Sequence, residues 1–211
     1  CLVASNAGAR GLLQVLPKLS RLRSLDLSRR NLLGAHGVSV LAQGLQGTDH
    51  LTQLAHLDLS ESAICGSPGG EALGHLLCLC DNLRSLALED NALASEGLGA
   101  MLLVLQEKSG SLSQVRCWKL GTIAADGASG GRAISHLLRR SRAEDVVVSG
   151  NPLGATGLSA MISDFPAGFK LVSCVAVGCG LVLSRAEDED VVELMKMYAT
   201  SVHVKPTRWG S

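Results

Sequence analysis

A two-part pattern recurs along the chain about every 29 residues and constrains the fold more than any other feature. One part is a glycine followed four residues later by an aliphatic residue. It occurs at Gly11/Val15, Gly37/Leu41, Gly69/Leu73, Gly97/Met101, Gly130/Ile134 and Gly157/Met161. The other part, Leu-x-x-Leu-x-Leu, precedes the glycine. Its copies are Leu22/Leu25/Leu27, Leu54/Leu57/Leu59 and Leu83/Leu86/Leu88, then the weaker Leu112/Val115/Cys117, Ala143/Val146/Val148 and Leu171/Cys174/Ala176. Two linked patterns at one period indicate a repeat architecture.

Each unit combines two apolar periods. Leu-x-Leu alternates with period two and predicts a short strand, whereas the segment after the glycine has helical spacing. We expect strands near 25–27, 57–59, 86–88, 115–117, 146–148 and 174–176. We expect helices near 36–46, 69–80, 95–107, 129–140, 155–163 and 185–199. Neither element buries its apolar side alone, so stacked units form a parallel sheet covered by a row of helices.

Two polar features of the unit carry structural expectations. Asn91 and Asn151 follow their strands, where a side-chain amide can bond the backbone of neighbouring turns as a ladder. The repeated glycine suits a tight turn into the helix.

These residues resemble the leucine-rich repeats of the ribonuclease-inhibitor type, whose unit reads L-x-x-L-x-L-x-x-N/C-x-L-G-x-x-G-x-x-x-L. The closest copies run from Leu83 to Met101 and from Val146 to Met161, and the resemblance covers about residues 1 to 197. It implies an α/β horseshoe of about six repeats, with the sheet on the concave face and helices on the convex face. The second unit has Ser62 where asparagine is expected, and the fourth has no asparagine.

The pattern also suggests the domain organisation. We expect one leucine-rich-repeat domain over residues 1–200, followed by an extended exit or cap over 201–211. Residues 1–19 correspond to the helical half of a unit. Because the chain starts in the middle of the pattern, we expect it to be a piece of a longer protein.

Composition and the absence of several motifs limit the classes of function that we expect for the chain. Lys plus Arg and Asp plus Glu both count 19, so the zero net charge argues against a nucleic-acid partner. The longest apolar stretch, Leu171 to Leu183, has 13 residues and is too short to span a bilayer. The seven cysteines form no C-x-x-C pair, and the histidines form no i, i+4 pair. With no P-loop motif, we expect no metal, no cofactor and no enzymatic activity.

The strand residues that flank the leucines are the candidate binding surface. The early strands are acidic, the fourth is basic with a tryptophan, and the last two are apolar. Such a graded surface suits a protein partner. The partner-binding residues we expect are Asp26, Asp58, Glu61, Glu89, Asp90, Arg116, Trp118 and Lys119. For Trp118 two placements stay open: outward among Arg116 and Lys119, or inward if the fourth unit is shifted in register.

The functional expectation is a non-catalytic interaction scaffold or assembly subunit. Two alternatives come from the same resemblance: a GTPase activator similar to the Ran activator, and the sensor half of an immune receptor. Unpaired cysteines and missing N-x-[ST] sequons favour a reducing, cytoplasmic location. An association with the cytoskeleton or cilium is a further expectation.

Overall fold

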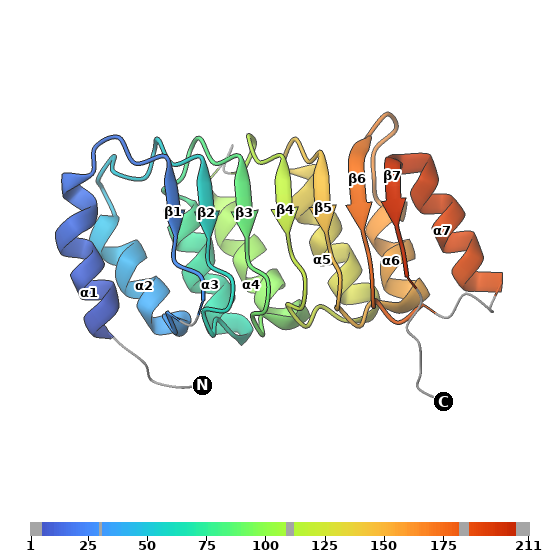
Figure 1. Cartoon of the computed structure of the whole chain (residues 1–211), viewed down its shortest axis with the longest axis horizontal. Helices are drawn as coiled ribbons and strands as arrows, with labels where there is room; N and C mark the ends of the chain where they lie inside the picture. Colours follow the sequence, from blue (N-terminus) through green and yellow to red (C-terminus); the bar gives the residue numbers. More distant parts are fainter. Residues whose placement is uncertain (1–5, 30, 109–111, 182–185, 206–211) are drawn as a thin grey trace.

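The computed structural model describes residues 6–29, 31–108, 112–181 and 186–205. Within these ranges the chain forms one parallel sheet of seven strands in sequence order, and its helices lie along one side of it (Figure 1). The strands are β1 (Ser24–Asp26), β2 (His56–Asp58), β3 (Ser85–Ala87), β4 (Cys117–Lys119), β5 (Asp145–Val147), β6 (Leu171–Val175) and β7 (Ala199–His203). The helices are α1 (Asn6–Val15), α2 (Gly34–Leu45), α3 (Gly66–Leu77), α4 (Ala94–Glu107), α5 (Gly127–Arg139), α6 (Gly154–Ser163) and α7 (Ala186–Tyr198), with a 3₁₀ turn η1 (Leu16–Lys18) after α1.

The predicted fold class is confirmed. All neighbouring strands pair in parallel, and a helix connects each strand to the next from β1 to β6. β1, β2, β3 and β5 lie one residue from their predicted positions, and the helix ends from α2 to α7 lie within three residues of theirs. The strand and helix periods therefore located these elements accurately.

The fourth strand was predicted wrongly. β4 spans Cys117–Lys119 instead of 115–117, and Trp118 aligns with Leu86 of β3 and with Val146 of β5. The unit therefore reads Val115-x-x-Trp118-x-Leu120, three residues later than the Leu112/Val115/Cys117 reading. The search for aliphatic residues missed it because a tryptophan fills a position that other units give to leucine, valine or cysteine.

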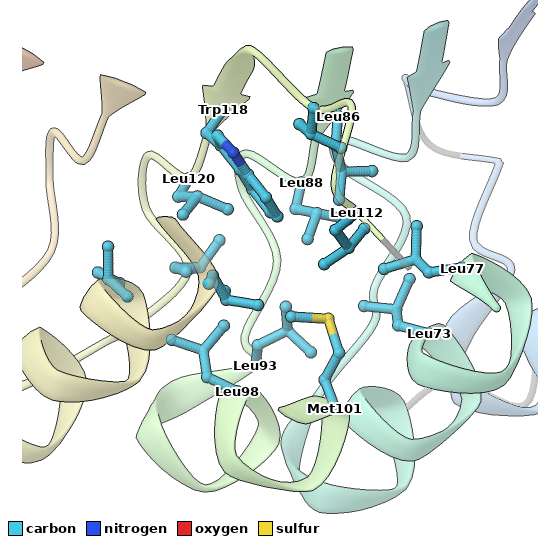
Figure 2. Close-up of a cluster of buried hydrophobic side chains, with 14 of the residues drawn as sticks. Leu73, Leu77, Leu86, Leu88, Leu93, Leu98, Met101, Leu112, Trp118 and Leu120 are labelled. Atoms are coloured by element: carbon cyan, nitrogen blue, oxygen red, sulfur yellow. The ribbon is translucent and has the colours of Figure 1, made fainter. Parts of the chain in front are cut away.

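A continuous apolar layer between sheet and helices forms the core. Leu57 and Leu86 point into it with 3% and 0% of their surface exposed, as predicted. Figure 2 shows Leu86 of β3, Leu88 just after it and Trp118 of β4 facing Leu98 and Met101 from α4. At about 25 cal/mol per Å² of buried apolar surface, this layer is the main source of stability.

The asparagine ladder is confirmed and is buried. The Asn91 side chain accepts from the backbone N–H groups of Ser62 and Ile64 at 3.2 and 3.0 Å, and donates to the carbonyls of Leu59 and Leu88. Asn151 repeats the arrangement two units later. Each side chain therefore satisfies backbone groups of its own turn and of the preceding one, which would otherwise be buried without partners.

Other units fill the same position differently. The Cys179 thiol donates to the carbonyl oxygen of Val148 at 3.2 Å, and Ser62 donates to that of Leu27 at 3.1 Å. Ile123 lies three residues after Leu120 and brings no polar group. The ladder is therefore complete only at the third and fifth turns.

The expectation for the repeated glycines was wrong. The repeated glycines lie inside the helices, and the left-handed residue at the first position of α2 to α6 lies three residues earlier, at Gly34, Gly66, Ala94, Gly127 and Gly154. Two of the repeated glycines, Gly97 and Gly157, instead allow neighbouring helices to pack closely. A Cβ on Gly97 would lie 2.7 Å from the carbonyl oxygen of Gly66, and one on Gly157 would lie 2.5 Å from that of Gly127. Close backbone contact therefore joins α3 to α4 and α5 to α6.

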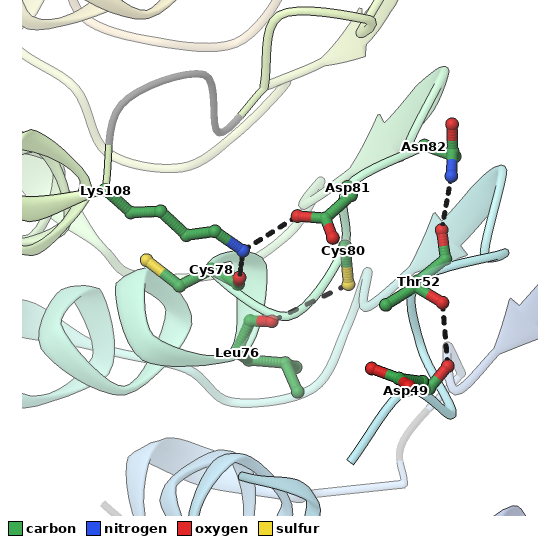
Figure 3. A network of polar contacts seen from close by, with 8 residues as sticks. All are labelled: Asp49, Thr52, Leu76, Cys78, Cys80, Asp81, Asn82 and Lys108. Atoms are coloured by element: carbon green, nitrogen blue, oxygen red, sulfur yellow. Dashed lines mark hydrogen bonds and ion pairs between the residues drawn. The ribbon is translucent and has the colours of Figure 1, made fainter. Parts of the chain in front are cut away.

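Basic side chains connect the helix C-termini of neighbouring units. Lys108 donates to the carbonyl of Cys78, at the end of α3, and forms an ion pair with Asp81 at 2.7 Å (Figure 3). Arg140 donates to the carbonyl oxygen of Leu105 in α4 at 2.7 Å. A cation at these carbonyls also stabilises the negative end of each helix dipole.

The two ends of the chain differ from the middle. α1 and η1 occupy most of the predicted first helix, of which residues 1–5 lie outside the described ranges. At the other end, β7 pairs with β6 across the boundary predicted at residue 200. Residues 201–203 are therefore part of the sheet, and residues 206–211 lie outside the described ranges.

Candidate partner-binding face of the sheet

The strand side chains that point away from the helices form the candidate surface, which we call the open sheet face. Its rows follow from the strand register. The middle row reads Asp26, Asp58, Ala87, Lys119, Val147, Val175 and His203. The row therefore changes along the sheet from two aspartates, through Ala87 and Lys119, to two valines, and it ends at His203.

Three predicted residues form the acidic half of this face. Asp26 is exposed, and Asp58 and Glu89 are partly exposed. Hydrogen bonds from the side chain and backbone N–H of Ser28 lower the pKa of Asp26. Burial raises the pKa of Glu89; Asp90 and Asp58 also raise it, and Lys119 opposes them. Glu89 is therefore harder to ionise in the folded protein than an exposed glutamate is.

Glu61 and Asp90 lie in the turns after β2 and β3. Both have left-handed backbones, with φ values of 54° and 55°, and both are exposed. The Asp90 carboxylate accepts a hydrogen bond from the Thr122 hydroxyl at 2.6 Å. These two acids therefore extend the acidic half to the edge of the sheet where the strands end.

The two predicted basic residues, Arg116 and Lys119, lie at different places relative to β4. Lys119 is exposed in the middle row of the open face. Arg116 precedes the strand and forms an ion pair with Glu144 at 2.9 Å, with both side chains about half exposed. Arg116 is thus engaged at the edge where the strands begin, whereas Lys119 lies on the open face, where its charge acts on Glu89.

Trp118 does not belong to this surface, so its placement among the binding residues was wrong. It is completely buried, and its indole N–H donates to the Ser141 hydroxyl at 3.1 Å. The corrected register places Cys117 and Lys119 on the open face of β4, with Gly121 and Thr122 after them. A Cβ on Gly121 would lie 3.2 Å from the Glu89 carboxylate, so this glycine leaves room for that side chain.

The later strands supply the apolar half. Val147, Val175 and Val177 are partly exposed on the open face. They were placed on this face from the sequence but were not named as binding residues. The sequence feature that could have identified them is a β-branched residue at the outward strand positions, where the earlier units have Ser or Asp.

Within the described ranges, no group of three or more His, Cys, Asp or Glu side chains is arranged to hold a metal ion. Cys78, Cys80, Cys117, Cys174 and Cys179 are free thiols. Burial raises the pKa of Cys80 and Cys174 to about 12 and that of Cys179 to about 11. These three thiols are therefore protonated and poorly nucleophilic at neutral pH. No helix in the described part of the chain is long and apolar enough to cross a membrane.

Sheet order, alternating helices and buried asparagines define an α/β solenoid of the leucine-rich-repeat type. No family model matches the sequence, and no curated protein matches it. Among solved structures, the C-terminal domain of tropomodulin from Caenorhabditis elegans is similar. It is 14% identical, the match covers 89% of this chain and 91% of that one, and the TM-score is 0.48.

Proposed function

We propose that the protein is a non-catalytic binding module whose open sheet face holds a segment of a partner protein. The gradient along the middle row carries the proposal: Asp26 and Asp58 at one end, Lys119 at the centre, and Val147 and Val175 at the other end. A complementary segment has basic residues over the early strands and apolar residues over the later ones. Opposite charges set its direction, and the valines supply surface to bury.

Two finer expectations accompany this proposal. The unit is of the ribonuclease-inhibitor-like type. This is supported by the helix in the second half of each unit and by Asn or Cys at the ladder position of several units. A reducing cytoplasmic location is supported by the free thiols of Cys78, Cys80, Cys117, Cys174 and Cys179. Association with the cytoskeleton stays a prediction.

The test uses a phage-displayed library of short random peptides, selected on the immobilised chain. We expect enriched peptides to combine Lys or Arg at one end with aliphatic or aromatic residues at the other. Asp58→Lys and Val147→Asp should each weaken binding of the best peptide roughly tenfold or more. Matched changes on the helix side, Glu107→Lys and Leu103→Asp, should leave it unchanged, since both residues are exposed there.

Two results would overturn the proposal. One is a selection without enrichment. The other is a set of enriched peptides whose affinity responds equally to the open-face variants and to the helix-side variants. Melting curves of all four variants show whether a loss of affinity reflects a loss of folded protein.

A further inference from the structure

The two edges of the sheet carry opposite charge in the middle of the molecule. Because the strands are parallel, the turns before them lie along one edge and the turns after them along the other (Figure 1). The turns after β2 to β5 have no lysine or arginine and four acidic residues: Glu61, Glu89, Asp90 and Asp126. The turns before β3, β4 and β5 have two acidic residues, Asp81 and Glu144, and five basic ones: Arg84, Lys108, Arg116, Arg140 and Arg142. The edge where the strands begin is therefore the basic one.

Internal contacts engage two of these five cations. Lys108 and Arg140 each donate to a backbone carbonyl near the C-terminus of the preceding helix, as described above. Arg84 and Arg142 are exposed, and neither forms an ion pair with any residue that the structure describes. Their charge is therefore available to a partner.

Backbone hydrogen bonds bring these arginines together with Arg116. The Arg116 N–H donates to the carbonyl oxygen of Arg84 at 2.8 Å, and the Arg142 N–H donates to that of Val115 at 3.1 Å. Neighbouring strands of a sheet lie about 4.8 Å apart. Three consecutive turns thus place one arginine each in a short row, which we call the arginine edge: Arg84, Arg116 and Arg142.

Arg116 shows which group this row binds. Its Nη1 donates to a carboxylate oxygen of Glu144 at 2.9 Å, and its other guanidinium N–H groups remain available to a second acceptor. Guanidinium groups match carboxylates well because two parallel N–H groups can face the two oxygens. The arginine edge holds three guanidinium groups and Glu144 supplies one carboxylate, so the row has donors for further carboxylates.

The shape of the row favours a peptide over a nucleic acid. Its arginines are spread along the edge, and an extended peptide, which rises about 3.3 Å per residue, presents a series of side chains over such a distance. The turns before β3, β4 and β5 contain no aromatic residue on which a base could stack. The acidic turns at the opposite edge also repel a long phosphate backbone.

We propose that the arginine edge binds an acidic segment of a partner protein, whose carboxylates contact Arg84, Arg142 and the available side of Arg116. This surface lies in the turns before the strands, so it is separate from the open sheet face. The proposal does not rest on the function proposed for that face.

Fluorescence anisotropy with a labelled peptide of alternating Glu and Ser tests this proposal. We expect the whole chain to bind the peptide at low salt, and rising salt to weaken binding because charges attract. The matched peptide with Gln in place of Glu should not bind. Arg84→Gln/Arg142→Gln should weaken binding roughly tenfold. Arg10→Gln/Arg132→Gln removes the same charge from exposed positions on α1 and α5 and should leave the affinity within about twofold of wild type.

A second pair of variants separates this site from a general effect of charge. Glu144→Gln removes the carboxylate that competes for Arg116 and should tighten binding of the Glu peptide. Glu71→Gln makes the same charge change on α3, where Glu71 is exposed, and should not. Circular dichroism and melting show that all variants are folded. The basic peptide selected on the open sheet face should bind Arg84→Gln/Arg142→Gln as tightly as wild type, so the two proposals fail separately.

Three results would overturn the proposal. One is a Glu peptide that does not bind even at low salt. Another is an equal loss of affinity in the two double variants, which would show that only net charge matters. The third is a single-stranded oligonucleotide of equal charge that binds more tightly than the Glu peptide, which would identify the row as a phosphate-binding surface.

Discussion

Trp118 donates its indole N–H to the hydroxyl oxygen of Ser141, 3.1 Å away, from a completely buried position in β4. Trp118→Ala removes the largest fully buried side chain in the described chain and should cost about 3–5 kcal/mol of unfolding free energy. Trp118→Phe keeps most of the apolar burial and should cost less. Urea unfolding of both variants measures the difference.

Ser141 supplies a control for this contact. Ser141→Ala leaves the indole N–H without its partner and should cost about 1–3 kcal/mol. In the double variant with Trp118→Phe, that penalty should largely disappear, because no donor remains unsatisfied. Additive losses in this cycle would show that the hydrogen bond contributes nothing to stability.

Much of the fold could be predicted from the sequence alone, because the leucines mark the buried positions of the strands and helices. The strands at Leu57 and Leu86 and the helices after them were predicted within a few residues. The fourth strand was not, because alternation alone cannot separate Val115/Cys117 from the true Trp118/Leu120 pair. Only its alignment with Leu86 in the folded sheet decides the register.

The candidate site was predicted less completely. The acidic residues were placed on the correct face because the register of their strands was predicted correctly, whereas Trp118 was assigned to the wrong face. The glycine role was wrong for a different reason: close approach of α3 and α4 at Gly97 depends on tertiary packing. Local sequence shows that a glycine is present but not which neighbour approaches it.

The asparagine ladder predicts a large position-dependent effect. Asn151→Ala should cost about 3 kcal/mol or more, because it leaves the backbone N–H groups of Ile123 and Ala125 and the carbonyl of Leu120 without partners. The carbonyl of Val148 keeps the hydrogen bond from the Cys179 thiol. Asn31→Ala should change stability by less than about 0.5 kcal/mol, since Asn31 is exposed. Thermal unfolding of the two variants tests this, and equal losses would contradict a stabilising role for the ladder.

Ala94 offers a route to higher stability. It has a left-handed backbone, with φ of 56°, at the turn position where four other units have glycine. A non-glycine residue there costs roughly 1 kcal/mol, so Ala94→Gly should raise the melting temperature. Ala100→Gly, inside α4, should lower the melting temperature, because glycine in a helix interior costs about 1 kcal/mol relative to alanine. A drop in both variants would show that the turn tolerates alanine without strain.

Glu89 predicts a pH dependence. Its pKa is raised in the folded state, chiefly by burial, so the folded protein holds this proton more tightly than the unfolded chain does. Its contribution to stability should therefore increase as pH falls through the folded pKa. Glu89→Gln should stabilise the protein at neutral pH, and the difference should shrink as pH approaches and passes below 4.5, the ordinary pKa of a glutamate side chain. A difference that stays constant over this range would exclude titration of Glu89 as the cause.

The most direct test of partner binding by the open sheet face is a charge-swap cycle on the best selected peptide. Asp58→Lys should weaken that peptide roughly tenfold, about 1.4 kcal/mol, and replacing the peptide's basic residue by glutamate should weaken it similarly. Combining both changes should restore most of the wild-type affinity, because opposite charges again face each other across the acidic half. Isothermal titration calorimetry measures all four dissociation constants. Strictly additive losses, with no recovery in the swapped pair, would contradict binding of a basic segment over Asp58.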